Sequence, residues 1–466
     1  MIILGTNSIK DTGYNVANSL RFNDGDSQEL SFTVDGTPTH QDKGTWSFWI
    51  KRGNILGAVV RIFSAYAGGG ATQTWIRFDA DDKLDIANRV SASFNTRLVT
   101  NRVFKDASAW YHIVIAFDSS QGTDSNRVKL YVNGVQETSF ATGTYPSQND
   151  DLEANTNGIP ITWGAEGVGN DEYFDGYIAE TVFIDGQQLA ADQFGEFDSD
   201  SGIWKPIDVS GLTFGTNGYF LEFKESGTSA NASGMGADTS GNTHHFAVTN
   251  LAAIDQSTDT CTNNFCTLSP LWNSFNQGTL SEGNLKSSMT SGAYKTNLAS
   301  FGVSQGKWYW EIKVTQASNV NFLNFGVTDE STNKNIDFKA LAGTTLYNNT
   351  TGKISIDGSE DGSAAAKFAV GDIVGIALNM DDKEISFFKN GSALFSDVDM
   401  SSTSNLVFPF HIAYTYATYI FEYNFGGTQS FAISSGNTDG NGYGNFEYAV
   451  PSGYFALCTK NLAEYG

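Results

Sequence analysis

The sequence predicts an all-β protein built from two tandem antiparallel β-sandwiches joined by an irregular connector. Three observations carry this prediction: apolar and polar residues alternate with a period of two, Asn-Gly pairs end several alternating runs, and helical periodicity is nearly absent. The composition agrees, because 13% of the 466 residues are aromatic and 49 are glycine, whereas only 7 are proline. Such a composition is typical of many short strands joined by polar turns.

The first half of the chain contains alternating runs that end at a hairpin signal. Thr45–Lys51 places Trp46, Phe48 and Ile50 on one face, and Trp110–Phe117 alternates in the same way. Asn133-Gly134 ends a further run, and this pair favours a type I′ turn because both central positions need a positive φ. We therefore expect an antiparallel sheet in this half.

The second half repeats this order of strand, polar turn, strand and Asn-Gly. Lys307–Val314 and Asp372–Met380 alternate, and Glu384–Lys389 leads directly into Asn390-Gly391. A long aromatic run, Phe408–Phe425, follows. Because the pattern occurs once in each half, we predict two sandwiches rather than one large sheet.

Changes in residue composition and in alternation along the chain predict the domain boundaries. The strongest helical candidate, Ala190–Phe197, covers barely two turns, and Asn217–Lys224 is an isolated strand candidate. We divide the chain into an N-terminal arm at 1–15, a first sandwich at 16–205, a Ser/Thr/Asn/Gly-rich connector at 206–265, a second sandwich at 266–450 and a C-terminal tail at 451–466.

The charge balance narrows the partners that we expect. Lys and Arg number 27 against 51 Asp and Glu, so the formal net charge is −24. Nucleic-acid binding rests on Lys and Arg, so we expect no such partner. No run approaches the ~20 apolar residues of a membrane span, and we expect no membrane insertion. The start lacks the features of a signal peptide, so we expect synthesis in the cytoplasm without a cleaved signal.

Two sets of motifs resemble known domain families. Four segments resemble a laminin-G or concanavalin-A-like lectin sandwich, namely Ser19–Leu30, Thr45–Arg52, Trp110–Asp118 and Val128–Gly134. Four later segments resemble a SPRY domain, namely Gly306–Val314, Phe325–Asp329, Gly371–Gly391 and Phe408–Tyr414. The resemblance implies a lectin-like jelly roll followed by a SPRY-like sandwich.

A third set resembles virion proteins of tailed phages, mainly fibre- or adhesin-like ones. Its segments are Ser199–Gly211, Gly215–Phe223, Asp238–Leu251, Thr262–Leu271 and Tyr454–Glu464. The resemblance implies a non-enzymatic tail fibre or adhesin of the virion that recognises host surface glycan. It also implies a homo-oligomer, with trimers usual for such fibres, which contacts other virion proteins through the arm at 1–15. The alternatives are a capsid or tail decoration protein without a ligand of its own and a glycan hydrolase.

Sugar-binding candidates come from the aromatic residues, because aromatic rings stack on sugar faces. The candidates are Trp49, Trp75, Trp163, Tyr173 and Tyr347. Most aromatic side chains must fill cores, so any one of these can equally be structural.

Calcium is the one cofactor that the sequence suggests, because calcium prefers hard oxygen ligands in Asp-rich loops. One such loop contains Asp79, Asp81 and Asp82, and another contains Asp171, Glu172 and Asp175. Neither loop has the fixed spacing of a known calcium motif, so ordinary surface charge is the alternative.

We predict no catalytic residue. Ser304 lies in a G-x-S-x-G pattern that runs into a strand rather than a helix. Glu196, Asp198 and Asp200 alternate as in some glucanases, but their segment reads as a loop. The pair His244-His245 has no further ligand at zinc spacing.

The three cysteines are expected to be reduced. Cys261 and Cys266 are close enough in sequence to form a bridge, which is the alternative, and Cys458 stands alone.

Overall fold

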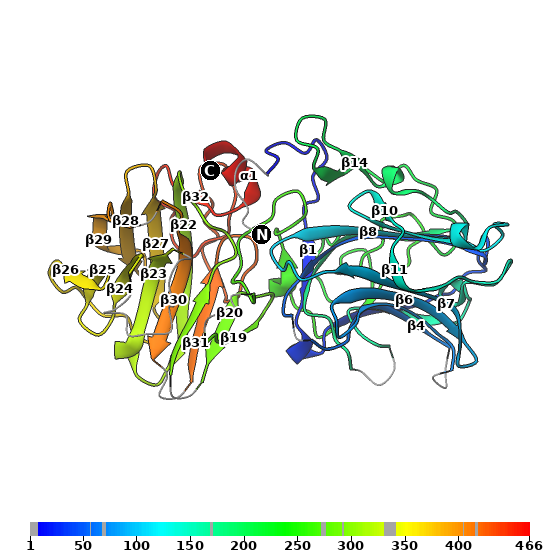
Figure 1. The fold of residues 1–466 in the computed structure, drawn as a ribbon, viewed down its shortest axis with the longest axis horizontal. Coiled ribbons are helices and arrows are strands. Elements are labelled where there is room, and N and C mark those ends of the chain that lie inside the picture. The colour runs from blue at the N-terminus through cyan, green and yellow to red at the C-terminus, as the bar shows by residue number, and fades with distance from the viewer. Residues whose placement is uncertain are drawn as a thin grey trace. The chain divides into compact units, whose positions relative to one another are not determined.

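A computed structural model describes most of the chain and is nearly all-β, as predicted (Figure 1). The described residues are 8–55, 57–67, 71–167, 171–271, 276–290, 293–329, 342–403, 405–414 and 418–466. Two compact units are present. Thr12–Thr262 forms the first, and Asn263–Gly466 forms the second together with residues 8–11.

The first unit contains two antiparallel sheets. In the sheet around β3 the strand order is β10-β9-β8-β3-β13-β1-β18, and β16 also pairs with β13. Its strands are β1 (Ser19–Phe22), β3 (Lys43–Arg52), β8 (Trp110–Asp118), β9 (Val128–Val132), β10 (Val135–Glu137), β13 (Gly176–Asp185), β16 (Tyr219–Leu221) and β18 (Gln256–Ser257).

In the sheet around β5 the strand order is β11-β7-β6-β5-β4-β12-β2-β17. Its strands are β2 (Glu29–Thr33), β4 (Val60–Tyr66), β5 (Gln73–Phe78), β6 (Lys83–Val90), β7 (Ser93–Val103), β11 (Phe140–Thr144), β12 (Pro160–Trp163) and β17 (Ala247–Thr249).

The alternation in β3 explains how this unit is packed. Trp46, Phe48 and Ile50 point into the main core, as the period of two predicts. The other face of the same sheet is buried too, because later segments pack across it and form a second apolar cluster that includes Val182, Phe214 and Phe220. The β3 sheet is therefore covered on both faces.

The segment 206–265, which we expected to be a connector, instead adds strands to this unit. β16 pairs with β13, β17 with β2, and β18 with β1, all antiparallel. β16 lies within the predicted strand candidate Asn217–Lys224, whereas β17 and β18, with three and two residues, are too short to show a period of two in the sequence. Burial of Phe220 and Leu221 holds the segment in place.

The predicted hairpin turns are confirmed. Asn133 and Gly134 have φ values of +48° and +78° and join β9 to β10. Asn390 and Gly391 have the same pair of values and join β28 (Glu384–Lys389) to β29 (Ser392–Asp399).

The second unit is also a sandwich. One sheet has the order β19-β20-β31-β22-β27-β28-β29, with β32 pairing in parallel with β22, and the other has the order β21-β30-β23-β24-β25-β26. The remaining strands are β19 (Thr279–Ser281), β20 (Lys286–Met289), β21 (Tyr294–Leu298), β22 (Lys307–Ala317), β23 (Leu323–Thr328), β24 (Thr344–Asn348), β25 (Lys353–Ile356), β26 (Ser359–Asp361), β27 (Ile373–Asn379), β30 (Phe408–Tyr414), β31 (Tyr419–Asn424) and β32 (Phe455–Ala456).

Helical structure differs from the sequence prediction. The helical candidate Ala190–Phe197 forms the short 3-10 helix η5 (Ala191–Gln193) and the strand β14 (Gly195–Phe197), which pairs with β15 (Trp204–Pro206). Among the described residues the single α-helix is α1 (Thr459–Tyr465), in the predicted tail. A seven-residue helix shows too few turns for its period to be recognised in the sequence.

The described residues of the N-terminal arm contact residues elsewhere in the same chain. Within the second unit, Lys10 Nζ lies 2.9 Å from Glu464 Oε1. Within the first unit, the Tyr14 hydroxyl donates a hydrogen bond to Glu180 Oε1 at 2.7 Å. Residues 1–7 of the predicted arm lie outside the described residues.

Candidate functional site

A hollow of about 390 Å³ lies beside the β14–β15 hairpin of the first unit. Three aromatic side chains line it, Tyr131 from β9, Phe197 from β14 and Trp204 from β15, together with the carboxylates of Asp192 and Glu196. We call this site the aromatic hollow. Its residues come from strands that are distant in sequence, which the hairpin brings against the outer face of the β3 sheet.

Two glycines hold the indole of Trp204 in place. A Cβ atom on Gly134 would lie 2.2 Å from Cε3 of Trp204, and one on Gly195 would lie 2.6 Å from its Cε2. Both distances are far below van der Waals contact, so only glycine fits at either position. Gly134 also has a φ of +78°, which glycine adopts without strain.

A buried histidine fixes the orientation of the same indole. Trp204 Nε1 donates a hydrogen bond to His112 Nδ1 at 3.0 Å. The ring proton of His112 must then be on Nε2, which lies 2.8 Å from Ser47 Oγ. Burial lowers the pKa of His112 to about 3, so the ring is neutral at physiological pH. Trp49 stacks on His112 with 4.6 Å between ring centroids.

The ring of Phe197 is the exposed part of the hollow. Phe197 is 52% exposed, and its ring meets the ring of Trp204 in an edge arrangement with 4.9 Å between the ring centroids. Tyr131 is partly buried, and burial together with the charge of Asp192 raises the pKa of its hydroxyl. The hollow therefore offers apolar ring surfaces beside polar groups, an arrangement that suits the apolar faces and hydroxyl edges of a sugar.

The rim of the hollow contains the acidic residues that resembled a catalytic strand. Glu196 lies on β14 rather than in a loop, and Lys205 Nζ lies 3.3 Å from both Glu196 Oε1 and Asp198 Oδ2. Hydrogen bonds from the backbone and side chain of Ser201 lower the pKa of Asp198 to about 2. Asp198 is therefore ionised at neutral pH, whereas the acid of a glycoside hydrolase needs a raised pKa.

The aromatic candidates from the sequence lie elsewhere. Trp163 and Tyr347 are 1% and 0% exposed in the two main cores, so their rings cannot reach a ligand at the surface. Trp49 is buried beneath His112, and Tyr173 is partly buried. Residue type alone does not separate Trp204 from Trp163, because both lie within two residues of an isoleucine and a glycine in the sequence.

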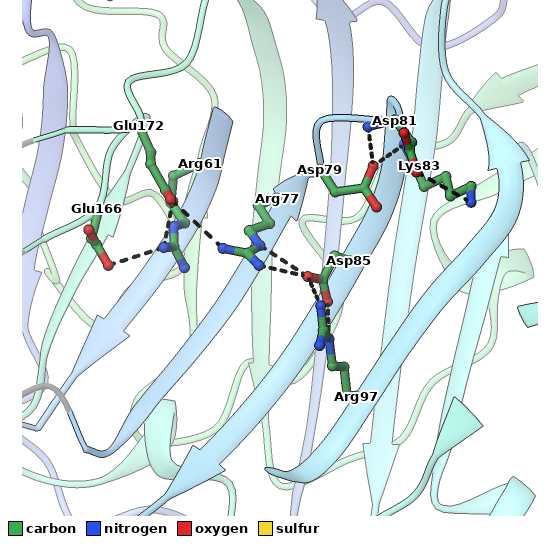
Figure 2. A network of polar contacts seen from close by, with 9 residues as sticks. All are labelled: Arg61, Arg77, Asp79, Asp81, Lys83, Asp85, Arg97, Glu166 and Glu172. Atoms are coloured by element: carbon green, nitrogen blue, oxygen red, sulfur yellow. Dashed lines mark hydrogen bonds and ion pairs between the residues drawn. The ribbon is translucent and has the colours of Figure 1, made fainter. Parts of the chain in front are cut away.

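Trp75 lies on the outer face of the β5 sheet, within a row of alternating charges. The guanidinium carbons of Arg77 and Arg61 lie 4.8 and 5.3 Å from the centroid of its ring. Asp85 accepts from both Arg77 and Arg97, at 3.0 and 3.1 Å (Figure 2). Trp75 is only 4% exposed beneath these neighbours.

The same row continues across β4 into the loop that contains Glu166 and Glu172. Arg61 lies 3.1 Å from Glu166 and 2.6 Å from Glu172, which also lies 3.8 Å from Arg77 (Figure 2). We call the row Glu166, Arg61, Glu172, Arg77, Asp85 and Arg97 the charge ladder. Each cation in it already faces a carboxylate, so it reads as a cross-strand support of the sheet.

The first predicted calcium loop directs its carboxylates to other partners. Asp79 Oδ1 accepts from the backbone N–H groups of Asp81 and Lys83, each at 2.9 Å (Figure 2). The buried carboxylate of Asp82 lies 2.7 Å from Arg52, and its other oxygen lies 3.4 Å from Lys105. These carboxylates do not converge on one point, and cations already occupy the surroundings of Asp82.

Residues of the second predicted calcium loop also contact other partners in the chain. Glu172 belongs to the charge ladder, the backbone carbonyl of Asp171 accepts from the backbone N–H of Glu166 at 3.3 Å, and Asp175 accepts from the backbone of Asn54 at 3.0 Å. In the part of the chain that the structure describes, no three His, Cys, Asp or Glu residues gather in a way that could hold a metal ion. The donor sets of both loops, as arranged, do not fit calcium.

The remaining candidates make structural contacts. His244 Nε2 lies 3.3 Å from Asp35 Oδ1, and His245 Nδ1 accepts from the backbone of Asp238 at 3.1 Å. Ser304 is exposed in the turn before β22. All three cysteines are free thiols, so Cys261 and Cys266 are not bridged.

Comparison with known families identifies both sandwiches. Residues 23–193 match the family model of the concanavalin A-like lectin/glucanases superfamily, and residues 307–428 match that of the SPRY domain. The chain carries a lectin-like domain followed by a SPRY domain. The aromatic hollow straddles the end of the lectin-like match, because Tyr131 and Asp192 lie inside it whereas Phe197 and Trp204 lie beyond residue 193.

Similar solved structures each cover between 32% and 51% of this chain. The SPRY domain of human HERC1 is 22% identical, covering 32% of this chain and 90% of its own, with a TM-score of 0.27. A heptameric SAP-like pentraxin from Limulus polyphemus is 17% identical, covering 39% and 81%, with a TM-score of 0.29. A Bacteroides ovatus protein, provisionally described as a carbohydrate binding protein, is 14% identical, covering 51% and 58%, with a TM-score of 0.33.

No curated protein sequence matches the chain. Within the described residues, no helix combines the length and the apolar character needed to cross a membrane.

Proposed function

We propose that the chain is a non-enzymatic virion protein of a tailed phage, a tail fibre or adhesin whose lectin-like domain binds host surface glycan through the aromatic hollow. The observation that supports glycan binding is the exposed ring of Phe197 beside the clamped indole of Trp204, with carboxylates at the rim. Rings held in a fixed position stack on a sugar without losing rotamer freedom on binding.

Two carboxylates at the rim, those of Asp198 and Glu196, support binding without catalysis. Asp198, with its pKa lowered to about 2, holds no proton to donate at neutral pH. Glu196 is largely exposed and faces Lys205, whereas the acid of a glycosidase lies in an apolar pocket that keeps it protonated. Glu196 therefore does not lie in the kind of surroundings that a glycosidase acid occupies.

The virion setting is supported by the resemblance of segments on both sides of the hollow. Ser199–Gly211, which resembles phage fibre proteins, contains Trp204 itself. In this proposal the protein is a homo-oligomer, with three copies as the expected number, and contacts other virion proteins through the arm at 1–15. Several weak glycan sites on one particle then combine into tight attachment.

The test is adsorption of the purified full chain to host cells and its competition with intact virions. Replacing Phe197 by Ala removes the exposed ring, and we expect about tenfold weaker adsorption. Phe94→Ala is the matched control, because Phe94 is also exposed, at 40%, but lies on the β5 sheet. Absence of adsorption by the wild-type chain contradicts the adhesin proposal. Location of that chain across the capsid surface would then favour a decoration protein.

A further inference from the structure

The aromatic hollow has no cationic side chain among its lining residues, although it has two acidic ones. Asp192 and Glu196 line it, and the remaining lining residues are aromatic, alanine or glycine. Both carboxylates are exposed to solvent, so a ligand in the hollow would meet their charge directly. Lys129 lies two residues before Tyr131 on β9 but does not line the hollow.

The nearest cation of the rim is already engaged. Lys205 Nζ lies 3.3 Å from a carboxylate oxygen of Glu196 and 3.3 Å from one of Asp198, and its side chain is only 15% exposed. Two of the three rim carboxylates, those of Glu196 and Asp198, therefore share one ammonium group, and the carboxylate of Asp192 adds a further negative charge. The rim keeps a net negative charge at neutral pH.

The histidine behind the hollow cannot supply a positive charge. His112 is buried and neutral at physiological pH, with its pKa lowered to about 3, and its Nδ1 is occupied as the acceptor of Trp204 Nε1. An acidic sugar bound against Trp204 would therefore face the rim carboxylates without a compensating cation.

We propose that the aromatic hollow selects sugars that carry no acidic group, either neutral or amine-bearing, and rejects uronic and sialic acids. This inference rests on the proposed glycan binding and adds the chemical class of the ligand. The Phe197 and Trp204 rings contact the apolar face of the sugar, while Asp192 and Glu196 accept hydrogen bonds from its hydroxyl or ammonium groups. A carboxylate on the ligand is repelled when it lies within the Debye length of the rim's net negative charge, so acidic glycans bind about tenfold more weakly.

The experiment measures binding of the full chain to an array of bacterial polysaccharides. Every acidic polysaccharide on it is immobilised twice, in its native form and after chemical reduction of its carboxyl groups to neutral primary alcohols. We expect the wild-type chain to retain neutral and amine-bearing glycans. Acidic glycans with a compatible backbone should be retained about tenfold better after carboxyl reduction, and 1 M salt should narrow this difference, because it shortens the Debye length to about 3 Å.

Two charge variants and one control connect the result to the hollow. Asp192→Asn and Glu196→Gln together should remove the preference for reduced over native acidic glycans and should weaken the binding of amine-bearing ones, whose ammonium groups lose their anionic partners. Asp81→Asn should change neither, because its side chain is 78% exposed on the other sheet. If the wild-type chain retains native acidic glycans and loses them after carboxyl reduction, the proposed ligand class is wrong. Glycan binding itself would still stand. Retention of no glycan by the wild-type chain overturns the proposed function itself.

Discussion

Trp204 donates its indole N–H to Nδ1 of His112, a ring that lies between Trp204 and Trp49 and is almost completely buried. The hydrogen bond requires a neutral imidazole, because a protonated one has no acceptor. The orientation of the candidate binding ring therefore depends on the protonation state of a histidine in the sheet behind it.

This dependence predicts how the stability of the first unit changes with pH. The pKa of His112 is about 3 in the folded protein and near 6.5 when unfolded, so the unfolded chain binds the proton more tightly. The stabilisation that neutral His112 contributes to the folded state is complete above about pH 6.5. It falls by up to about 1.4 kcal/mol per pH unit as the pH decreases towards 3. Denaturant unfolding between pH 7 and 4.5 measures this slope.

His112→Asn should remove the His112 contribution to the slope. His40→Asn is the control, because His40 is exposed in the same unit. Equal slopes for the wild type and His112→Asn would contradict the neutral, buried state of His112.

The glycine clamp predicts an effect on binding that does not remove any ring. Gly134→Ala introduces a Cβ 2.2 Å from Trp204 at a φ of +78°, so we expect about 1–3 kcal/mol of destabilisation and a displaced indole. Gly122→Ala is the matched control, because nothing lies within 4 Å of its added Cβ. Intrinsic tryptophan fluorescence and glycan binding should change in the first variant only. An unchanged Gly134→Ala variant would show that Trp204 is not clamped.

Asp85 is the central carboxylate of the charge ladder, and its removal should be costly. It is 0% exposed and accepts from Arg77 and Arg97, so Asp85→Asn leaves two guanidinium groups without their shared anion. We expect about 3 kcal/mol lower free energy of unfolding, measured with denaturant, and no loss of glycan binding. Asp81→Asn should stay within about 0.5 kcal/mol of the wild type. Loss of glycan binding in a folded Asp85→Asn protein would move the site from the hollow to the ladder.

Glu180 predicts a pH effect of the opposite sign. Burial raises its pKa to about 8, from an ordinary value near 4.5, and Tyr14 donates to it. The folded protein binds this proton more tightly, so stability from this group is complete below about pH 4.5 and is lost as the pH rises through 8. Glu180→Gln resembles the protonated form and should raise the melting temperature at pH 8.5 but not at pH 4.5. A variant that melts lower than the wild type at pH 8.5 would mean that the carboxylate is stabilised in its ionised form.

Period-two alternation predicted which face of β3 enters the core, and the Asn-Gly pairs predicted two hairpins. The alternation could not predict whether other segments cover the opposite face of β3. The alternation implies that Trp49 and Lys51 lie on the face opposite Phe48, yet both are buried, because segments from elsewhere in the chain pack over them. An exposed face and a covered face have the same local pattern.

The candidate site shows the same limit more sharply. Trp204 and Trp163 are both tryptophans near glycine, but one borders a hollow and the other fills a core. The difference arises from strand order, which places Gly134 of the β9–β10 turn against the β14–β15 hairpin. No local signal in the sequence carries that long-range pairing. The acidic residue Glu196 was noticed, but only as a member of a catalytic pattern.

The strands contributed by residues 206–262 also determine where this protein can be cut or recombined. β16, β17 and β18 each pair with a strand that precedes residue 193. A fragment that ended with the family match would expose the edges of β1 and β2 and would lose both Phe197 and Trp204. Transfer of the first unit to another protein, in evolution or in engineering, must therefore carry the whole stretch from Thr12 to Thr262.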